Sequence, residues 1–164
     1  MKSGLKIAVI GAGSTYTPEL IEGFIKRKED IDVECFCFYD IDDYKLIIVA
    51  GLVKRMLAAG GFNSRVVIAE DIREAVAGAD FVIGQIRVGK LKARIRDEKI
   101  PLKHGLLGQE TTGAGGFMNA LRTIPAIMEI AAAIEKYAPD AWFINFSNPS
   151  GIIAEAVLNH TGVK

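Results

Sequence analysis

A glycine turn near the amino terminus contains the residues whose types and spacing point most directly to chemistry. It follows an apolar run at 7–10, which has the character of a strand buried on both faces. Gly11 and Gly13 allow a tight turn and a close approach of a ligand to the backbone. Thr17 can cap a following helix, and Pro18 suits its first position, where no amide hydrogen is needed. The positive end and free amides of that helix would face the turn, which predicts a binding site for a phosphate or pyrophosphate.

The turn departs from the G-x-G-x-x-G pattern at its third position, which is Tyr16. Ser14 and Thr15 offer hydroxyl groups for further contacts with a nucleotide. Tyr16 either packs on the ligand or fills the space that a third glycine leaves open. Because the turn stands between a strand and a helix start, we favour a nucleotide-binding turn over a purely structural one.

Asp40 ends the next apolar run, which covers 33–39. A carboxylate at this place accepts hydrogen bonds from the ribose hydroxyls of NAD and repels a 2′-phosphate, so Asp40 favours NAD over NADP. It lies somewhat further beyond the glycine turn than the usual spacing of about 20 residues. The alternative role for Asp40 is to cap a helix, but Asp42 or Asp43 can supply that cap.

Three further polar residues are candidates for binding or catalysis. Arg87 ends a buried apolar run, and its planar guanidinium suits a phosphate or carboxylate; a structural ion pair with Glu110 or another acid is an open alternative. Asn148 follows the run at 141–146 and can bond a sugar hydroxyl or the nicotinamide, although Asn-Pro is also an ordinary turn signal. Residues 109–113 are polar and flanked by glycine, which is typical of a substrate loop and also of a flexible surface loop.

Alternating strand-like and helix-like segments must position these residues. Strands are expected at 7–10, 33–39, 65–69, 79–86 and 141–146. Helices are expected at 17–28, from 42 or 43 up to 60, at 71–77, over part of 90–104 with Pro101 as a breaker, at 117–137 with Pro125 as a kink or second start, and at 152–160. No helix or strand is expected through 105–116.

This alternation predicts one α/β domain over residues 1–164, with a Rossmann-like, doubly wound parallel sheet and helices on both faces. Such sheets bind ligands at the carboxyl ends of their strands. The glycine turn, Asp40, Arg87 and Asn148 all follow strands, so we expect them at that one edge.

The overall composition argues against several other classes of protein. Twenty basic and 20 acidic residues give a formal net charge of zero, which disfavours a nucleic-acid or polybasic membrane role. No apolar run approaches the roughly 20 residues of a membrane span, and we expect no signal peptide before the first strand. Cys35 and Cys37 form neither a disulfide framework nor a zinc pattern. We expect a reduced, cytoplasmic protein with no nucleic-acid and no membrane partner.

Five motifs spread along the whole chain share one resemblance. They are Gly-Ala-Gly-Ser-Thr-Tyr-Thr-Pro-Glu-Leu at 11–20, Phe-Tyr-Asp-Ile-Asp at 38–42, Ile-Arg-Val-Gly-Lys at 86–90, Gly-Gln-Glu-Thr-Thr-Gly at 108–113 and Asn-Phe-Ser-Asn-Pro-Ser-Gly at 145–151. Together they resemble glycoside hydrolase family 4, an NAD-dependent exception among glycosidases. Tyr16 in place of a third glycine is what this family shows. The segments Ile-Pro-Leu-Lys-His-Gly and Asn-Pro-Ser-Gly are similar to its 6-phospho-β-glucosidase branch.

The resemblance implies hydrolysis of a phosphorylated disaccharide or aryl glycoside through transient oxidation at C3 by NAD. Loss of the C2 proton, elimination at C1, water addition and return of the hydride would follow, with a divalent metal, usually manganese, polarising the C2 and C3 oxygens. It also implies a homo-oligomer. The resemblance assigns NAD binding to Gly11, Gly13, Ser14, Thr15, Tyr16 and Asp40, sugar binding to Arg87 and Asn148, and a candidate catalytic role to Glu110.

Members of this family are considerably longer, and their metal-binding cysteine and histidine, acid and tyrosine base would lie beyond Lys164. We therefore expect the catalytic and metal-binding domain to lie outside this chain, with no metal ligand inside it and no hydrolysis by the chain alone. Two other hypotheses stay open. One is an NAD-dependent dehydrogenase of the malate or lactate type, and the other is a nucleotide-sensing domain without catalysis.

Overall fold

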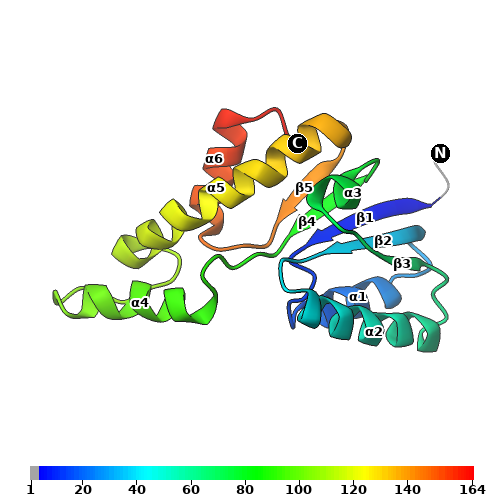
Figure 1. Ribbon diagram of the computed structural model, residues 1–164, viewed down its shortest axis with the longest axis horizontal. Helices are drawn as coiled ribbons and strands as arrows, with labels where there is room; N and C mark the ends of the chain where they lie inside the picture. Colours follow the sequence, from blue (N-terminus) through cyan, green and yellow to red (C-terminus); the bar gives the residue numbers. More distant parts are fainter. Residues whose placement is uncertain (1–3) are drawn as a thin grey trace.

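A parallel sheet forms the centre of the molecule (Figure 1). The computed structural model describes residues 4–164. The strands are β1 (Leu5–Ile10), β2 (Val33–Tyr39), β3 (Arg65–Ile68), β4 (Phe81–Gly84) and β5 (Trp142–Asn145). Their order is β3-β2-β1-β4-β5, and all neighbouring strands are parallel. The carboxyl ends of all these strands therefore lie along one edge of the sheet.

Helices cover both faces of this sheet. They are α1 (Thr17–Ile25), α2 (Asp43–Ala59), α3 (Ile72–Val76), α4 (Lys90–Leu102), α5 (Gly113–Tyr137) and α6 (Ser150–His160). Residues of α1 and α2 pack on one face, and residues of α3, α5 and α6 pack on the other. The prediction of a Rossmann-like, doubly wound α/β fold is confirmed.

Alternate residues of the central strand β1 contribute to two separate hydrophobic cores. Ile7 and Val9 face α1 and α2, whereas Ala8 and Ile10 face α3, α5 and α6. All of these side chains are buried. Because successive strand residues point to opposite faces, a strand covered on both sides must be apolar at every position, as the run at 7–10 is.

Helix α4 and the first turns of α5 project beyond the carboxyl edge of the sheet, at the left of Figure 1. The two helices pack against each other there. α5 then continues across the sheet, where Ile127, Ile130 and Ile134 are fully buried. This arrangement places the loop between α4 and α5 close to the ends of β4 and β5.

Helix α5 is long and apolar enough by length and composition to cross a membrane, although we expect no such stretch from the sequence. Arg122 and Asn119 interrupt its apolar surface, and one side of it packs on the sheet. The core helix of a globular fold passes the same test, and the packing of α5 fits that description.

The expectation of an irregular stretch through 105–116 is wrong at its end, because α5 begins at Gly113. Its glycines allow the helix to pack against the backbone of the preceding loop. A Cβ atom at Gly115 would lie 2.0 Å from the Gln109 carbonyl oxygen, and one at Gly116 would lie 2.5 Å from the Thr111 carbonyl. The apolar periodicity does not reveal this first turn, since residues 113–116 are three glycines and one alanine.

The two helix prolines interrupt less than the sequence suggests. Pro101 lies inside α4, one residue before its end, and Pro125 lies inside a continuous α5 with no second start. Most other elements match the expected ranges to within a few residues, the usual uncertainty of helix and strand ends.

The two cysteines are free and buried in strand β2. Burial raises the pKa of the Cys37 thiol, so a smaller fraction of it is thiolate at any given pH. We predict that iodoacetamide at pH 8 alkylates Cys35 and Cys37 more than about tenfold more slowly in the folded chain than in guanidinium chloride. Mass spectrometry of timed samples measures this ratio, and equal rates would contradict the burial of the two thiols.

Candidate functional site

The carboxyl edge of the sheet brings together the polar residues that the sequence pattern selects. The glycine turn follows β1, Asp40 follows β2, Arg87 follows β4 and Asn148 follows β5. Glu110 joins them from the loop between α4 and α5, through its ion pair with Arg87. The expected convergence at one edge is therefore present.

Most backbone amides of the glycine turn already have a hydrogen-bond acceptor within the protein. The Gly11 and Ala12 amides donate to the Tyr39 carbonyl oxygen at 2.8 and 3.1 Å, and the Ser14 amide donates to the Gly11 carbonyl oxygen at 3.1 Å. The Tyr16 amide donates to Ser14 Oγ at 3.2 Å. The turn thus offers fewer free amides than its sequence suggests, and a ligand would rely more on the hydroxyl groups and on the helix dipole.

Thr17 does not cap α1, contrary to expectation. Tyr16 holds the N-cap position and makes no side-chain cap hydrogen bond. The buried Thr17 hydroxyl instead donates to the Ala12 carbonyl oxygen at 2.8 Å and accepts from Gln85 Nε2 at 2.6 Å. Gln85 Nε2 also lies 3.3 Å from the Gly11 carbonyl oxygen. These two side chains fasten the turn to the end of β4, a role that only the tertiary arrangement reveals.

Asp40 is anchored by backbone amides rather than used as a helix cap. Its Oδ2 accepts from the Gly13 amide at 2.9 Å, and its Oδ1 accepts from the Asp42 amide at 2.9 Å. Each carboxylate oxygen keeps a further lone pair for a ligand donor. A Cβ atom on Gly13 would lie only 3.0 Å from Asp40 Oδ2, so this glycine allows the carboxylate to reach the turn.

Asp42 provides the cap of α2, as the sequence allows. Its side chain accepts from the Lys45 amide at 3.3 Å. Lys90 Nζ at the start of α4 donates to Asp42 Oδ2 at 2.9 Å. This hydrogen bond, helped by the Lys45 amide, holds the pKa of Asp42 below its usual value. The pair ties the segment after β4 to the start of α2.

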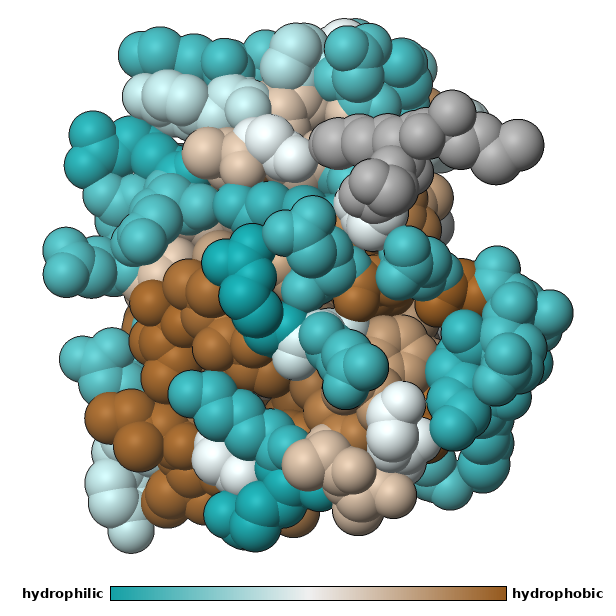
Figure 2. All heavy atoms as spheres, turned by 90° about the vertical axis from the view of Figure 1, so that its right-hand side faces the viewer, coloured by the Kyte–Doolittle hydropathy of each residue, from teal (hydrophilic) through white to brown (hydrophobic). Residues whose placement is uncertain are grey.

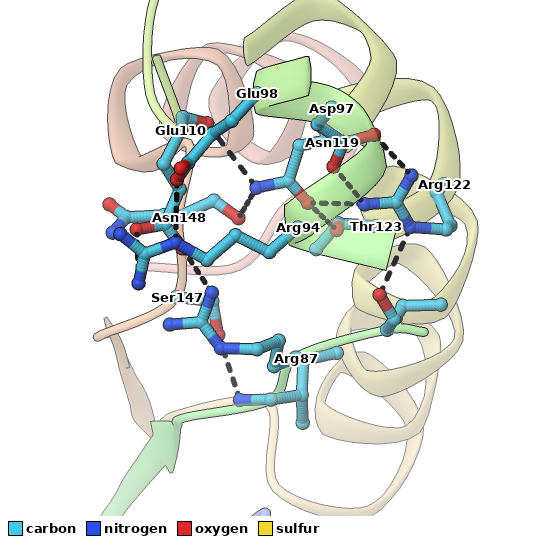
Figure 3. A network of polar contacts seen from close by, with 12 residues as sticks. Arg87, Arg94, Asp97, Glu98, Glu110, Asn119, Arg122, Thr123, Ser147 and Asn148 are labelled. Carbon is cyan, nitrogen blue, oxygen red and sulfur yellow. Dashed lines mark hydrogen bonds and ion pairs between the residues drawn. The ribbon is translucent and has the colours of Figure 1, made fainter. Parts of the chain in front are cut away.

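Glu110 lies between two arginines (Figure 3). Arg87 Nη1 donates to Glu110 Oε1, and Arg94 Nη1 lies 3.3 Å from Glu110 Oε2. Arg94 also donates from Nε to Glu98 at 2.8 Å, and this bond, with the charge of Glu110, raises the pKa of Arg94. The Arg87–Glu110 ion pair that the sequence left as an alternative is therefore present. The Arg87 side chain remains 39% exposed, so it keeps donors for a ligand.

Asn119 of α5 connects the segments that carry Glu110 and Asn148, and sequence reasoning missed it. Its Nδ2 donates to the carbonyl oxygens of Glu110 at 3.4 Å and Asn148 at 3.3 Å. Its Oδ1 accepts from the Thr123 hydroxyl at 3.0 Å and from Arg122 at 3.4 Å. A buried amide with four partners fixes the relative position of two site loops.

Arg122 and Asp97 form the ion pair that joins α5 to α4. Arg122 Nη1 and Nη2 lie 3.1 and 2.5 Å from the two Asp97 carboxylate oxygens, and Arg122 Nε donates to the Val88 carbonyl oxygen at 3.0 Å. The Asp97 side chain is only 6% exposed. This pair therefore holds the segment after Arg87 in place. In the sequence, the signal for this ion pair is an arginine within the mainly apolar stretch that forms α5.

The end of β5 is fixed to the end of β4 by Ser147. Its buried hydroxyl accepts from the Ile86 amide at 2.9 Å and donates to the Gly84 carbonyl oxygen at 3.2 Å. Phe146 beside it meets Tyr16 edge-on, with ring centroids 5.7 Å apart. Tyr16 is 53% exposed, so this contact leaves part of the ring open to a ligand.

Within residues 4–164, no three histidine, cysteine, aspartate or glutamate side chains are grouped to hold a metal ion. A hollow of about 330 Å³ lies at the opposite, amino edge of the sheet, beside Cys35 and Cys37. Charged side chains that line it already have partners within the chain: Arg65 pairs with Glu34 at the surface, and Lys6 donates to the carbonyl oxygens of Glu74 and Ala77. The polar residues of the carboxyl edge are the better candidates for a site.

The strand order reverses direction between β1 and β4, and the glycine turn lies at the carboxyl edge beside that point. These features define a protein of the Rossmann-like dinucleotide-binding class. Residues 6–164 match the model of the family described as family 4 glycosyl hydrolase. The chain belongs to this family, as its motifs predict.

Two comparisons with known proteins show the extent of the likeness. A probable 6-phospho-beta-glucosidase of Bacillus subtilis is 50% identical over 166 residues, which cover 100% of this chain and 38% of that protein. The structure of the 6-phospho-beta glucosidase from Thermotoga maritima with manganese, NAD+ and glucose-6-phosphate is 47% identical, with a TM-score of 0.89 over 95% of this chain and 38% of that one. The chain thus spans well under half the length of these relatives.

A more distant likeness concerns the fold alone. The lactate dehydrogenase from Eimeria maxima with NADH and oxamate is 17% identical, with a TM-score of 0.69 over 100% of this chain and 42% of that one. The dehydrogenase hypothesis therefore has the shared sheet in its favour and nothing more specific.

Proposed function

We propose that this chain is the NAD-binding portion, residues 1–164, of a 6-phospho-β-glucosidase. The observation that carries the proposal is the meeting of the glycine turn and the anchored Asp40 with Arg87, Glu110 and Asn148 at one sheet edge. The similarity of this chain to the Thermotoga maritima protein, whose structure is described with manganese, NAD+ and glucose-6-phosphate, supports NAD as the cofactor and a phosphorylated sugar as the substrate class.

The residues of the turn fit a dinucleotide. Asp40 has its carboxylate held in place by two amides and retains acceptor capacity for the vicinal hydroxyls of a ribose. Ser14 and Thr15 supply hydroxyl groups near the start of α1, whose positive end favours a pyrophosphate. In this proposal NAD, when bound, supplies a hydride acceptor, and it is held by Gly11, Gly13, Ser14, Thr15, Tyr16 and Asp40.

The sugar site in this proposal lies between the ends of β4 and β5. Arg87 presents a guanidinium with donors not used by Glu110, which suits a phosphate or a sugar oxygen. Asn148 is exposed beside it, and its backbone is held by Asn119. Glu110 supplies a carboxylate, 14% exposed, near the reacting end.

The remaining parts of the enzyme are proposed to lie outside this chain. Manganese, the acid and the base belong in this proposal to a catalytic domain that residues 1–164 do not contain. The proposal also includes a homo-oligomeric assembly and a cytoplasmic location.

The first experiment tests NAD binding. We predict that Asp40→Asn weakens NAD binding to the chain by about 10- to 100-fold, because a charge-assisted hydrogen bond contributes about 1.5–3 kcal/mol. Isothermal titration calorimetry measures the affinity. The control is Asp30→Asn, which removes an exposed carboxylate from the loop before β2 and leaves the affinity unchanged. If the wild-type chain, Asp40→Asn and Asp30→Asn all bound NAD with equal affinity, the assignment of Asp40 to NAD binding would be refuted.

The complete protein distinguishes the three hypotheses. An aryl 6-phospho-β-glucoside should be hydrolysed only with manganese and NAD, with NAD needed in catalytic amounts. Stoichiometric formation of NADH from a hydroxy acid would favour the dehydrogenase instead. NAD binding without turnover of either substrate would favour the nucleotide-sensing domain.

A further inference from the structure

Lys90 has a backbone conformation that is unfavourable for a lysine. Among residues 4–164 it is the one non-glycine residue with a positive φ, which is +54°. Gly89 before it has a φ of +80°, so two successive left-handed residues stand at the start of α4. A left-handed conformation brings the Cβ atom of an L-residue too close to the following carbonyl oxygen, and glycine avoids this. A lysine at such a position therefore points to a role of its side chain.

The ion pair that Lys90 makes does not account for the lysine through stability alone. Lys90 Nζ donates to Asp42 Oδ2 at 2.9 Å, but the lysine side chain is 63% exposed. An exposed ion pair contributes less free energy than the left-handed conformation costs a non-glycine residue. Glycine at position 90 would leave the free protein at least as stable, which points to a role of the lysine when a ligand is bound.

Another exposed ion pair in the molecule carries no such backbone strain. Arg65 of β3 pairs with Glu34 of β2 at 2.8 Å, and both residues lie in regular strands. They lie at the amino edge of the sheet, the side that faces the viewer in Figure 2, where hydrophilic side chains lie among hydrophobic ones. That pair joins two strands that the sheet already holds together. The Lys90–Asp42 pair differs because one of its residues is strained and because it joins loops from strands that are not neighbours.

The Lys90–Asp42 pair spans the position of the glycine turn. In the sheet, β1 lies between β2 and β4. Asp42 follows β2 and Lys90 follows β4, so their side chains connect the loops on the two sides of the turn that follows β1. The Asp42 amide also donates to Asp40 Oδ1 at 2.9 Å. One end of this connection therefore lies beside the carboxylate that holds the adenosine ribose in the proposed function.

The loop after β4 is fixed from its other side, since Arg122 Nε donates to the Val88 carbonyl oxygen at 3.0 Å. Lys90 thus extends from an anchored loop toward the adenosine end of the site. We propose that Lys90 is a positioning residue for the cofactor: by pairing with Asp42 it holds the loop after β4 against the adenosine half of bound NAD and slows its release. This inference rests on the proposed function, because it takes the adenosine half to bind between Asp40 and that loop.

The first test measures the release of NADH from the protein. Stopped-flow displacement of bound NADH by excess NAD, followed by NADH fluorescence, gives the dissociation rate constant. We expect Lys90→Met to raise this constant about three- to fivefold, the effect of losing a partly exposed ion pair. The matched control is Lys92→Met, which removes the same charge from an exposed side chain two residues further along α4. It should change the rate by less than about twofold.

Asp42→Asn separates action through Asp42 from a direct contact of Lys90 with the cofactor. Asparagine keeps the cap of α2 but loses the charge that holds Lys90. We expect Asp42→Asn to speed NADH release as much as Lys90→Met does, and the double variant to release NADH no faster than either single variant. Faster release by Lys90→Met together with unchanged release by Asp42→Asn would mean that Lys90 touches the cofactor itself, and would overturn the proposal.

Lys90→Gly should move stability and binding in opposite directions. Relief of the left-handed lysine should raise the melting temperature of the ligand-free protein by about 2–4 °C. NADH release should quicken as in Lys90→Met, because glycine also lacks the ammonium group. A lower melting temperature for Lys90→Gly would mean that the lysine serves the stability of the free protein, and the proposal would be wrong.

Binding by the wild-type protein separates failure of this inference from failure of the proposed function. If isothermal titration calorimetry detects binding of neither NADH nor ADP-ribose, both fail. If both ligands bind and Lys90→Met releases NADH at the rate of Lys92→Met, the proposed function stands and this inference fails. ADP-ribose contains the adenosine half of NAD, so it should bind Lys90→Met about three- to fivefold more weakly than it binds the wild type. An effect on NADH without one on ADP-ribose would contradict the placement of Lys90 at the adenosine half.

Discussion

An Arg122→Met variant is expected to lose about 3 kcal/mol of unfolding free energy, the largest effect we predict for a single polar side chain. Methionine retains much of the length of arginine but leaves the Asp97 carboxylate, 6% exposed, without its cation. The Val88 carbonyl oxygen and the Asn119 side chain each lose a donor as well. Removing one member of a buried pair is costly because the remaining charge stays desolvated.

Urea denaturation monitored by circular dichroism measures this loss. The control is Arg65→Met, which breaks the exposed pair with Glu34 and should change the stability by less than about 1 kcal/mol. Adding Asp97→Leu to Arg122→Met should recover part of the loss, because it removes the unpaired charge. If Arg122→Met and Arg65→Met were equally stable, the buried pair would not be the link between α4 and α5.

The second large effect is expected for Gly11→Ala, which should lower the free energy of unfolding of the protein by about 2–4 kcal/mol. The φ of Gly11, +90°, is unfavourable for any residue with a Cβ atom. That atom would also lie 2.6 Å from the Gln85 carbonyl oxygen and 2.9 Å from its carbonyl carbon. Both obstacles are backbone atoms at the end of β4, so relief requires the turn to move away from that strand.

Gly78→Ala is the matched control for this prediction. Gly78 also has a positive φ, of +65°, but a Cβ atom there meets nothing within 4 Å. Gly78→Ala should lower the free energy of unfolding by only about 1–2 kcal/mol, which is the strain of the backbone conformation alone. Thermal and urea unfolding measure both variants, and calorimetry should show weaker NAD binding for Gly11→Ala only. Equal losses at the two glycines would mean that the close approach to β4 contributes nothing.

The sequence by itself determined the sheet and the edge at which the site forms. Apolar runs such as 7–10 mark strands buried on both faces, and their alternation with helical patterns permits essentially one parallel topology. Residues that directly follow strands, such as Asp40, Arg87 and Asn148, must then meet at the carboxyl edge. Local pattern suffices here because periodicity and chain connectivity are properties of the sequence itself.

Only the tertiary structure decided how that edge is held together. The use of Thr17 as a link to Gln85, the anchoring of Asp40 by the Gly13 amide and the Asp97–Arg122 pair all join residues from different elements. A polar side chain has the same identity whether it caps a helix, binds a ligand or pairs in the interior. Which partner it takes depends on the distances that packing sets, because a hydrogen bond or ion pair forms only where two groups are brought within a few ångströms.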